Sequence, residues 1–123
     1  MRLLALILLA VIQPSLLASV VTTVDCDFSR FINSDGVHTG YLELRFIVMD
    51  DGSALLADNN DTQDVQMIAE VNATTFIENS KYRKSITTIS NSLDAVYSFH
   101  TAPSFAGTIS AQYYGNCKKH FSD

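Results

Sequence analysis

Four oxygen-bearing side chains occupy alternate positions in one short segment of the chain: Asp58, Asn60, Thr62 and Asp64. Carboxylate, amide and hydroxyl oxygens at every second position are the ligands that open a calcium-binding loop. The pattern then departs from that loop, because its sixth position would be Gln63 rather than glycine and its twelfth Ala69 rather than glutamate. We therefore interpret the segment first as a hydrogen-bonded turn and second as a weak calcium site. No metal site is firmly predicted.

Acidic side chains could also act in pairs, as the two carboxylates of glycosidases do. The candidates are spread over several predicted strands and turns: Glu43, Asp58, Asp64, Glu70 and Glu78. A carboxylate-dependent hydrolase requires at least two of them to face a common cavity, and the sequence does not place any two together. Hydrolysis is therefore the third of our function hypotheses.

The remaining reactive side chains form no catalytic constellation. His38, His100 and His120 are too far apart in sequence to form a local zinc-binding pair. No serine has an identifiable base, which a serine nucleophile would need. The sequence accordingly indicates no catalytic residue and no cofactor.

Three aromatic side chains are candidates for lining a ligand or lying on the surface: Tyr97, Phe99 and Tyr114. Tyr97 and Phe99 belong to one predicted strand. Alternation along the last strand turns Tyr113 toward the core and Tyr114 to the opposite face. Because the chain has no tryptophan to anchor its interior, plain core packing is the stronger interpretation of these aromatic residues.

The chain begins with the layout of a secretory signal peptide. Arg2 precedes an apolar run at 3–12, and small residues follow at Ala18 and Ser19. The apolar run is too short to span a bilayer. We expect residues 1–19 to be removed, with cleavage near Ala18/Ser19, and residues 20–123 to form a single secreted or periplasmic domain without a membrane span.

In an oxidising compartment the two cysteines have only each other as intramolecular partners. Cys26 and Cys117 are therefore predicted to form a disulfide. The bond would close a loop of about 92 residues, which the chain-entropy model values at about 4.6 kcal/mol. For a domain of this size, such a staple would supply a large part of the stability.

Loss of Arg2 with the leader would leave a formal net charge of about −6. Nucleic acid is a poor partner for an acidic surface, because binding to phosphates requires a basic one. The charges are also segregated, with acids dominating residues 25–78 and bases dominating from Lys81 onward. Such asymmetry can orient a charged partner.

Alternation of apolar and polar residues predicts strands almost throughout the mature chain, as in residues 24–28 and 41–48. About eight strands with short connections indicate an all-β antiparallel meander, closed or nearly closed into a barrel. A two-layer sandwich is the alternative. Residues 29–39 are interpreted as a loop or short helical turn, and the last strand is expected to run from Phe105 to about Tyr114. The disulfide would make the first and last strands neighbours.

Three segments carry a resemblance to known proteins: residues 75–78, residues 87–89 and above all the sequence Gln-Tyr-Tyr-Gly-Asn-Cys at 112–117. They resemble small, exported, β-rich proteins of alphaproteobacteria that end in a Tyr-Tyr-Gly-x-Cys element. The resemblance covers the second half of the chain. It implies a periplasmic or extracellular setting and carries no activity and no functional residue.

The function favoured by these observations is non-catalytic binding, of either a small ligand in the barrel or a partner protein on the surface. The alternative is a structural, envelope-associated protein that interacts with another exported protein. Binding ranks above catalysis because the sequence contains export and disulfide signals but no catalytic motif.

Overall fold

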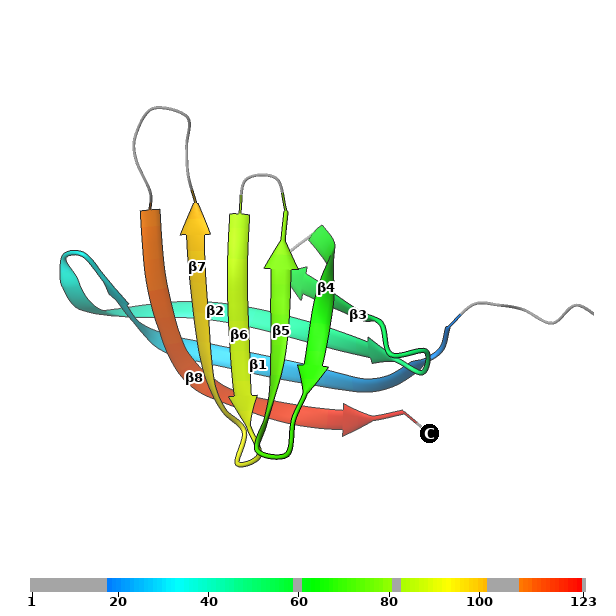
Figure 1. The fold of residues 1–123 in the computed structure, drawn as a ribbon. Helices are drawn as coiled ribbons and strands as arrows, with labels where there is room; N and C mark the ends of the chain where they lie inside the picture. The colour runs from blue at the N-terminus through cyan, green and yellow to red at the C-terminus, as the bar shows by residue number, and fades with distance from the viewer. Residues whose placement is uncertain (1–17, 59–60, 81–82, 102–108, 123) are drawn as a thin grey trace, which may run out of the picture.

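The computed structural model describes residues 18–58, 61–80, 83–101 and 109–122, and this part of the chain contains eight strands and no helix (Figure 1). The strands are β1 (Val20–Asn33), β2 (Gly36–Met49), β3 (Ala54–Asp58), β4 (Asp61–Ala69), β5 (Ala73–Asn79), β6 (Arg83–Ser90), β7 (Asp94–Thr101) and β8 (Ile109–Phe121). Within the described residues, none of the structure could cross a lipid bilayer as a long apolar helix.

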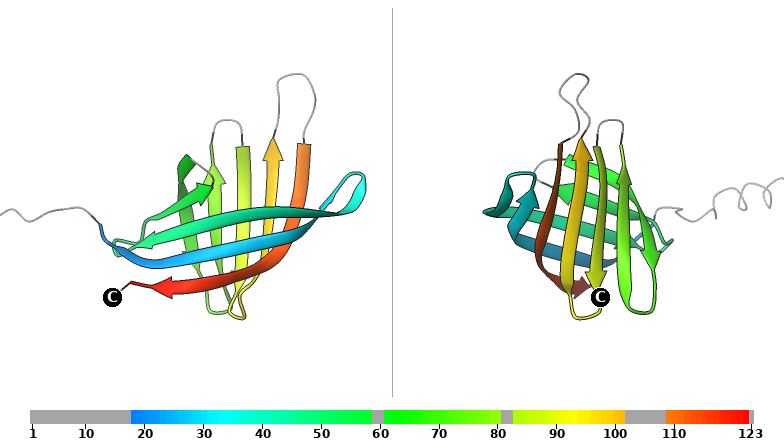
Figure 2. Two further views of the ribbon diagram at one scale, coloured as in Figure 1. Left: turned by 180° about the vertical axis from the view of Figure 1, so that it is seen from behind. Right: turned by 60° about the vertical axis from the view of Figure 1, so that its left-hand side comes forward.

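Each strand pairs antiparallel with the next, and β1 pairs with β8, so the sheet closes on itself (Figure 2). The predicted meander is therefore confirmed as a closed barrel, and the sandwich alternative is wrong. Closure pairs the two strands that would otherwise be sheet edges, which is how barrels avoid unpaired backbone groups. It also makes the first and last strands neighbours, as the cysteine positions predicted.

The three longest strands, β1, β2 and β8, curve across the shorter strands and extend past one end of the barrel (Figures 1 and 2). A bulge accompanies this curvature, since the register of β1 shifts between Phe28 and Arg30 against both of its neighbours. An extra residue in one strand bends and twists the sheet. Gly115 of β8 lies directly opposite Phe28, and it allows the two backbones to approach closely.

Two boundary predictions are wrong. Residues 29–39 are not a loop or helical turn, because β1 continues to Asn33 and β2 begins at Gly36, after a two-residue turn. The last strand does not end at Tyr114 but continues to Phe121, held by pairing with β1. In both segments, long-range strand pairing overrides weak local signals. The predicted start at Phe105 lies outside the described residues.

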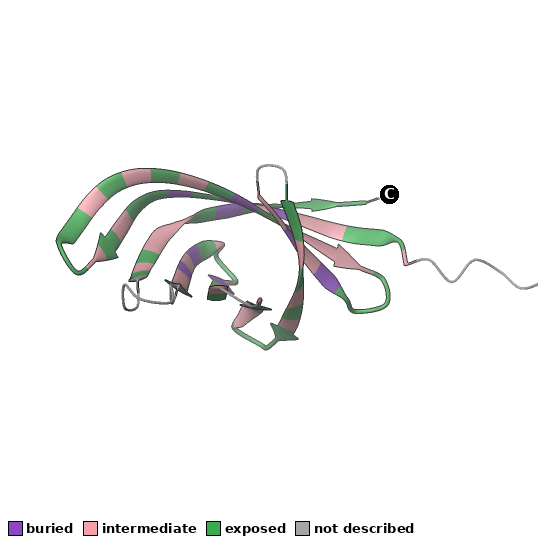
Figure 3. Cartoon of the chain, turned by 90° about the horizontal axis from the view of Figure 1, so that it is seen from above, coloured by how far each residue is buried: buried purple, intermediate pink, exposed green. Residues whose placement is uncertain are grey.

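Buried and more exposed residues alternate along the strands, as Figure 3 shows by colour, and the buried apolar side chains form the core as predicted. Phe28, Phe46, Phe76 and Tyr97 are fully buried, and the rings of Phe46 and Phe76 stack with centroids 4.2 Å apart. An eight-stranded barrel is just wide enough for side chains to fill. The centre of this barrel is therefore packed, and the interior space described below lies toward one end.

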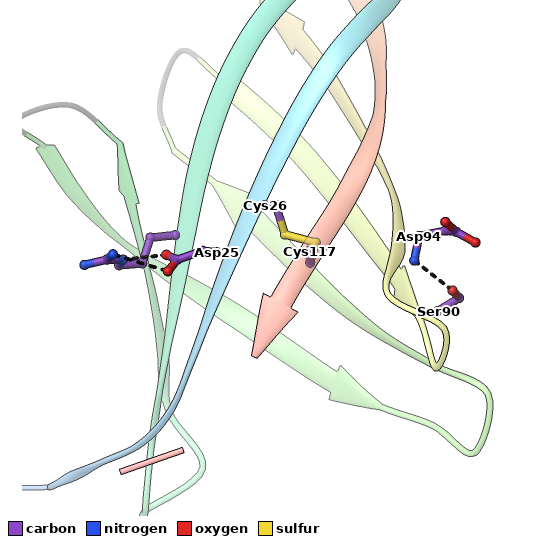
Figure 4. Close-up of a disulfide and its surroundings, with 6 residues drawn as sticks. Asp25, Cys26, Ser90, Asp94 and Cys117 are labelled. Carbon is purple, nitrogen blue, oxygen red and sulfur yellow. Dashed lines mark hydrogen bonds and ion pairs between the residues drawn. A yellow bond between two sulfur atoms is a disulfide. The ribbon is translucent and has the colours of Figure 1, made fainter. Parts of the chain in front are cut away.

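The predicted disulfide is present and crosses the seam of the barrel (Figure 4). Cys26 of β1 and Cys117 of β8 are direct register partners, with Cα atoms 4.0 Å apart, and both side chains are buried. The bond links positions separated by 91 residues in sequence. It therefore fastens covalently the pair of strands that closes the sheet.

Candidate functional site

The barrel interior opens into a small cavity at the end that carries the β4–β5 and β6–β7 turns; we call this opening the lower mouth. The cavity has a volume of about 150 Å³. Its apolar lining is formed by inward-facing side chains of five strands, β1, β2, β4, β5 and β6: Val24, Val48, Met67, Phe76 and Ile89. Its polar lining consists of Thr22, Thr74, Ser90, Asn91 and Lys119.

Lys119 reaches the lower mouth because of strand register. It is the direct partner of Val24, and paired residues of antiparallel strands project to the same face. Lys118, one residue earlier, pairs with Asp25 and therefore projects to the outer face. Among the described lining residues Lys119 is the only charged one, so the mouth combines an apolar floor with one positive charge.

The dimensions of the lower mouth limit what it could hold. A cavity of about 150 Å³ lined by aliphatic and aromatic side chains accommodates a group the size of benzene. Drug-sized ligands occupy pockets of roughly 300–1,000 Å³, which this mouth does not provide. The arrangement therefore suits a short apolar group whose polar end remains at the rim beside the Lys119 ammonium.

A buried polar cluster lies toward the opposite end of the barrel, around Arg83. The Arg83 guanidinium lies 3.9 Å from the carboxylates of both Asp58 and Glu78, and it donates a hydrogen bond to the Tyr97 hydroxyl. Ser85 donates a hydrogen bond of 2.9 Å to Glu78, which is only 5% exposed. Burial raises the pKa of Tyr97, and the positive charge of Arg83 partly opposes that shift.

This Arg83 cluster is built to neutralise a buried carboxylate. Transfer of an unpaired charge into the interior is costly, and Arg83 supplies the opposite charge that Glu78 needs. Its guanidinium also lies over the Phe99 ring, 5.4 Å from the centroid. Two buried polar atoms among the described residues, Arg83 Nε and Thr87 Oγ1, have no hydrogen-bond partner. The cluster therefore pairs the buried Glu78 carboxylate with a cation at this end of the barrel, beside a hollow of about 420 Å³ that Glu78 and Ser85 help to line.

The outer face of β1, β2 and β8 carries a strip of charged side chains. Asp25, labelled in Figure 4, accepts a hydrogen bond of 2.6 Å from Arg45. Its carboxylate also lies 3.3 Å from His120 Nε2. Asp27 and Glu43 are direct register partners, and the Tyr41 hydroxyl donates to Glu43 and lies 3.4 Å from Asp27. The hydrogen bond to Glu43, with the nearby negative charges, raises the pKa of Tyr41 to about 12.

The residues of the suggested calcium site are not brought to one point. Asp58 approaches Arg83 from the inner face, as described above. Thr62 pairs with Ala57 and Asp64 with Leu55, so both project from the opposite face of the hairpin. Asn60 lies outside the described residues. At the described positions, no group of three or more His, Cys, Asp or Glu side chains could hold a metal ion.

The structure separates the three aromatic candidates. Tyr97 is fully buried in the core, and Phe99 stacks against it with centroids 5.9 Å apart. Tyr114 projects outward, where the Arg30 guanidinium lies 5.6 Å from its ring centroid. Tyr113 packs against the core, as alternation predicted. Core packing therefore accounts for Tyr97 and Phe99, and only Tyr114 is available to a ligand.

Three pairs of the carboxylates considered for hydrolysis lie near one another. Asp58 and Glu78 share Arg83 as a charged neighbour. Glu43 and Asp58 line one hollow of about 630 Å³, and Asp64 and Glu78 line another of about 420 Å³. Glu43 belongs to the outer charged strip, and Glu70 is exposed near the β4–β5 turn. Asp64 projects away from Asp58, as its register shows. Because Arg83 lies 3.9 Å from both Asp58 and Glu78, these two carboxylates form an ion-pair cluster rather than an acid and a base flanking a substrate.

Sequence reasoning did not identify Lys119 as a site residue. The residue lies in a polar segment after Cys117 that local pattern assigns to a tail. Its inward orientation depends on pairing of β8 with β1, which a one-residue change of register would reverse. The available signal was the disulfide itself: register partners at Cys26 and Cys117 place Val24 opposite Lys119.

No family model, curated protein or solved structure matches this chain. The geometry of the chain itself is therefore the basis for the function proposed below.

Proposed function

We propose that this protein is a small exported binding protein, without catalytic activity, that takes a short-chain amphipathic carboxylate at the lower mouth. The observation that supports this proposal is the combination of an apolar floor inside the barrel with Lys119 on the rim. An aliphatic or aromatic tail would fill the cavity, and its carboxylate would pair with the ammonium group.

The expected affinity follows from the size of the cavity. Burial of a methylene group contributes about 0.8 kcal/mol, so five of them contribute about 4 kcal/mol, equivalent to a Kd of about 1 mM. A solvent-accessible ion pair with Lys119 adds up to about 1 kcal/mol, or about fivefold. The protein would therefore bind abundant small acids weakly and reversibly rather than sequester a rare one.

Export is part of the same proposal. The buried disulfide is compatible with an oxidising compartment. Ser19, the last residue of the leader expected at 1–19, donates its backbone N–H to Asp50 Oδ1 at 3.0 Å. Cleavage one residue earlier, between Ala18 and Ser19, would instead retain Ser19 and place the new α-ammonium group beside the Asp50 carboxylate.

The proposal is tested by titrating the disulfide-bonded domain with hexanoate and following backbone amide shifts by NMR. Saturable shifts are expected around the lower mouth, with a Kd of about 0.2 mM once the ion pair is included. Lys119→Gln should weaken binding about fivefold. Lys118→Gln is the matched control, because it removes the same charge from the outer face and should leave the affinity unchanged.

Hexanol provides the matched control ligand, since it has the same tail without the charge. Its affinity should be insensitive to Lys119→Gln. Equal weakening of hexanoate and hexanol by this variant would show that Lys119 acts on the shape of the mouth rather than on the carboxylate. Absence of saturable shifts with both ligands would overturn the proposal.

A further inference from the structure

A second hollow lies on the outer face of the barrel, where β6, β7, β8 and β1 run side by side; we call it the outer groove. Its volume is about 590 Å³, within the range of small-molecule sites. The side chains relevant to recognition are Ser29, Arg30, Thr88, Asp94, Tyr114 and Asn116. This groove shares only Ser90 with the lower mouth, and the inference does not depend on the function proposed for that mouth.

The bulge in β1 creates the groove. The register shift at Ser29 leaves both Ser29 and Arg30 exposed on the outer face, between the buried Phe28 and the half-buried Phe31. Bulges re-aim side chains and are frequent beside functional sites. Here the bulge directs the Arg30 guanidinium over the Tyr114 ring, at 5.6 Å from the centroid.

Strand register then aligns the rest of the groove. Thr88, Val96, Tyr114 and Arg30 form one row across β6, β7, β8 and β1, as consecutive register partners. Asp94 and Asn116 are partners in a second row beside it. The aromatic ring of Tyr114 therefore lies next to the planar polar side chains of Asp94 and Asn116, which belong to β7 and β8.

The charges in the groove select against an ionic ligand. Arg30 and Asp94 carry opposite charges, and within the described part of the chain neither has an ion-pair partner. Asp94 Oδ2 lies 3.3 Å from Ser92 Oγ, which leaves its other oxygen available as an acceptor (Figure 4 shows Asp94 at the β6–β7 turn). The groove thus offers donors, acceptors and no net charge.

We propose that the outer groove binds a neutral sugar unit of a glycan. Adjacent hydroxyl groups of a sugar each donate and accept hydrogen bonds, which Asn116, Asp94, Arg30 and the threonine hydroxyl can satisfy together. The apolar C–H face of the sugar would lie against the part of the electron-rich Tyr114 ring that the Arg30 guanidinium does not cover. An inorganic anion or a metal cation would contact only some of these donors and acceptors and would make no use of the aromatic ring.

The experiment is an NMR titration of the full mature domain with three neutral disaccharides: cellobiose, maltose and N,N′-diacetylchitobiose. Amide shifts localised to residues 29–30, 94–96 and 114–116 are expected with at least one of them. Tyr114→Ala should weaken binding about fivefold, whereas Tyr114→Phe should retain most of it. Tyr41→Ala, which removes an exposed tyrosine of the charged strip, is the control and should bind normally.

Two results would overturn the proposal. The first is absence of groove shifts with all three disaccharides at 50 mM, about the weakest binding that such a site could use. The second is localised shifts with sodium sulfate that exceed those with any sugar, which would identify Arg30 as part of an anion site. Hexanoate titration of the same samples reports separately on the lower mouth, so failure of one site is distinguishable from failure of the other.

Discussion

Among single residues, Tyr41 gives the clearest expectation for how folding stability depends on pH. Its folded-state pKa is raised from 10.0 to about 12 by the hydrogen bond to Glu43, so the native state holds a proton that the unfolded state releases. A raised folded-state pKa contributes stability that is complete below pH 10 and is lost as the pH rises toward 12. Tyr97, raised by burial, acts in the same direction.

We therefore predict that the free energy of unfolding decreases as the pH rises from 10 to 12, and that Tyr41→Phe reduces this decrease. Urea unfolding at several alkaline pH values measures both slopes. A residual slope in the variant is expected from Tyr97. Identical slopes in the variant and the wild type would show that Tyr41 has no coupling to Glu43.

At the scale of single residues, the sequence predicted orientation well wherever alternation was strong. Val24, Cys26 and Phe28 are buried as predicted, and Tyr113 and Tyr114 lie on opposite faces. It could not predict which polar residues face inward. The inward orientation of Glu78 and Lys119 depends on the register of neighbouring strands, which the residues themselves do not encode.

At the scale of elements, the bend of β8 against β1 depends on Gly115. A Cβ atom at this position would lie 1.9 Å from the backbone oxygen of Asp27 and 2.7 Å from the Cα of Phe28. Backbone atoms of a paired strand cannot move aside without losing the pairing. The bulge and the glycine therefore act together to bring the two strands into contact.

Gly115→Ala is predicted to destabilise the domain by about 3 kcal/mol or more, because it forces β1 and β8 apart. Gly40→Ala is the matched comparison: its Cβ would meet only the Phe31 ring, at 2.6 Å, and a side chain can turn away. We expect a cost of about 1 kcal/mol there. Chemical denaturation of both variants measures the difference, and equal costs would contradict the proposed role of Gly115.

Strand existence was also predictable at this scale, whereas strand ends were not. The hairpin of β1 and β2 continues through residues 29–39 because its two arms pair with each other, although the local sequence is polar and irregular. The same reason carries β8 beyond Cys117. Pairing with a neighbouring strand therefore holds these segments in an extended conformation, although their own β-propensity is weak.

At the scale of the whole molecule, the disulfide joins the two strands whose pairing closes the barrel. Replacing both cysteines, as in Cys26→Ala with Cys117→Ala, is predicted to lower the free energy of unfolding by about 2–5 kcal/mol. The value is large because the bond closes a loop of 91 positions in sequence. Urea unfolding with and without reductant provides the measurement, and reduced wild type should match the variant within about 1 kcal/mol. Unchanged stability would contradict a structural role.

The central claim is that the packed barrel binds small acids only at its lower mouth, and intermolecular NOEs test it most directly. With hexanoate at saturation, we predict NOEs from the ligand's terminal methyl group to the methyl groups of Val48 and Ile89, which line the floor. NOEs confined to exposed apolar residues such as Val71 or Phe121, which are 89% and 73% exposed, would contradict the account and indicate surface adsorption instead.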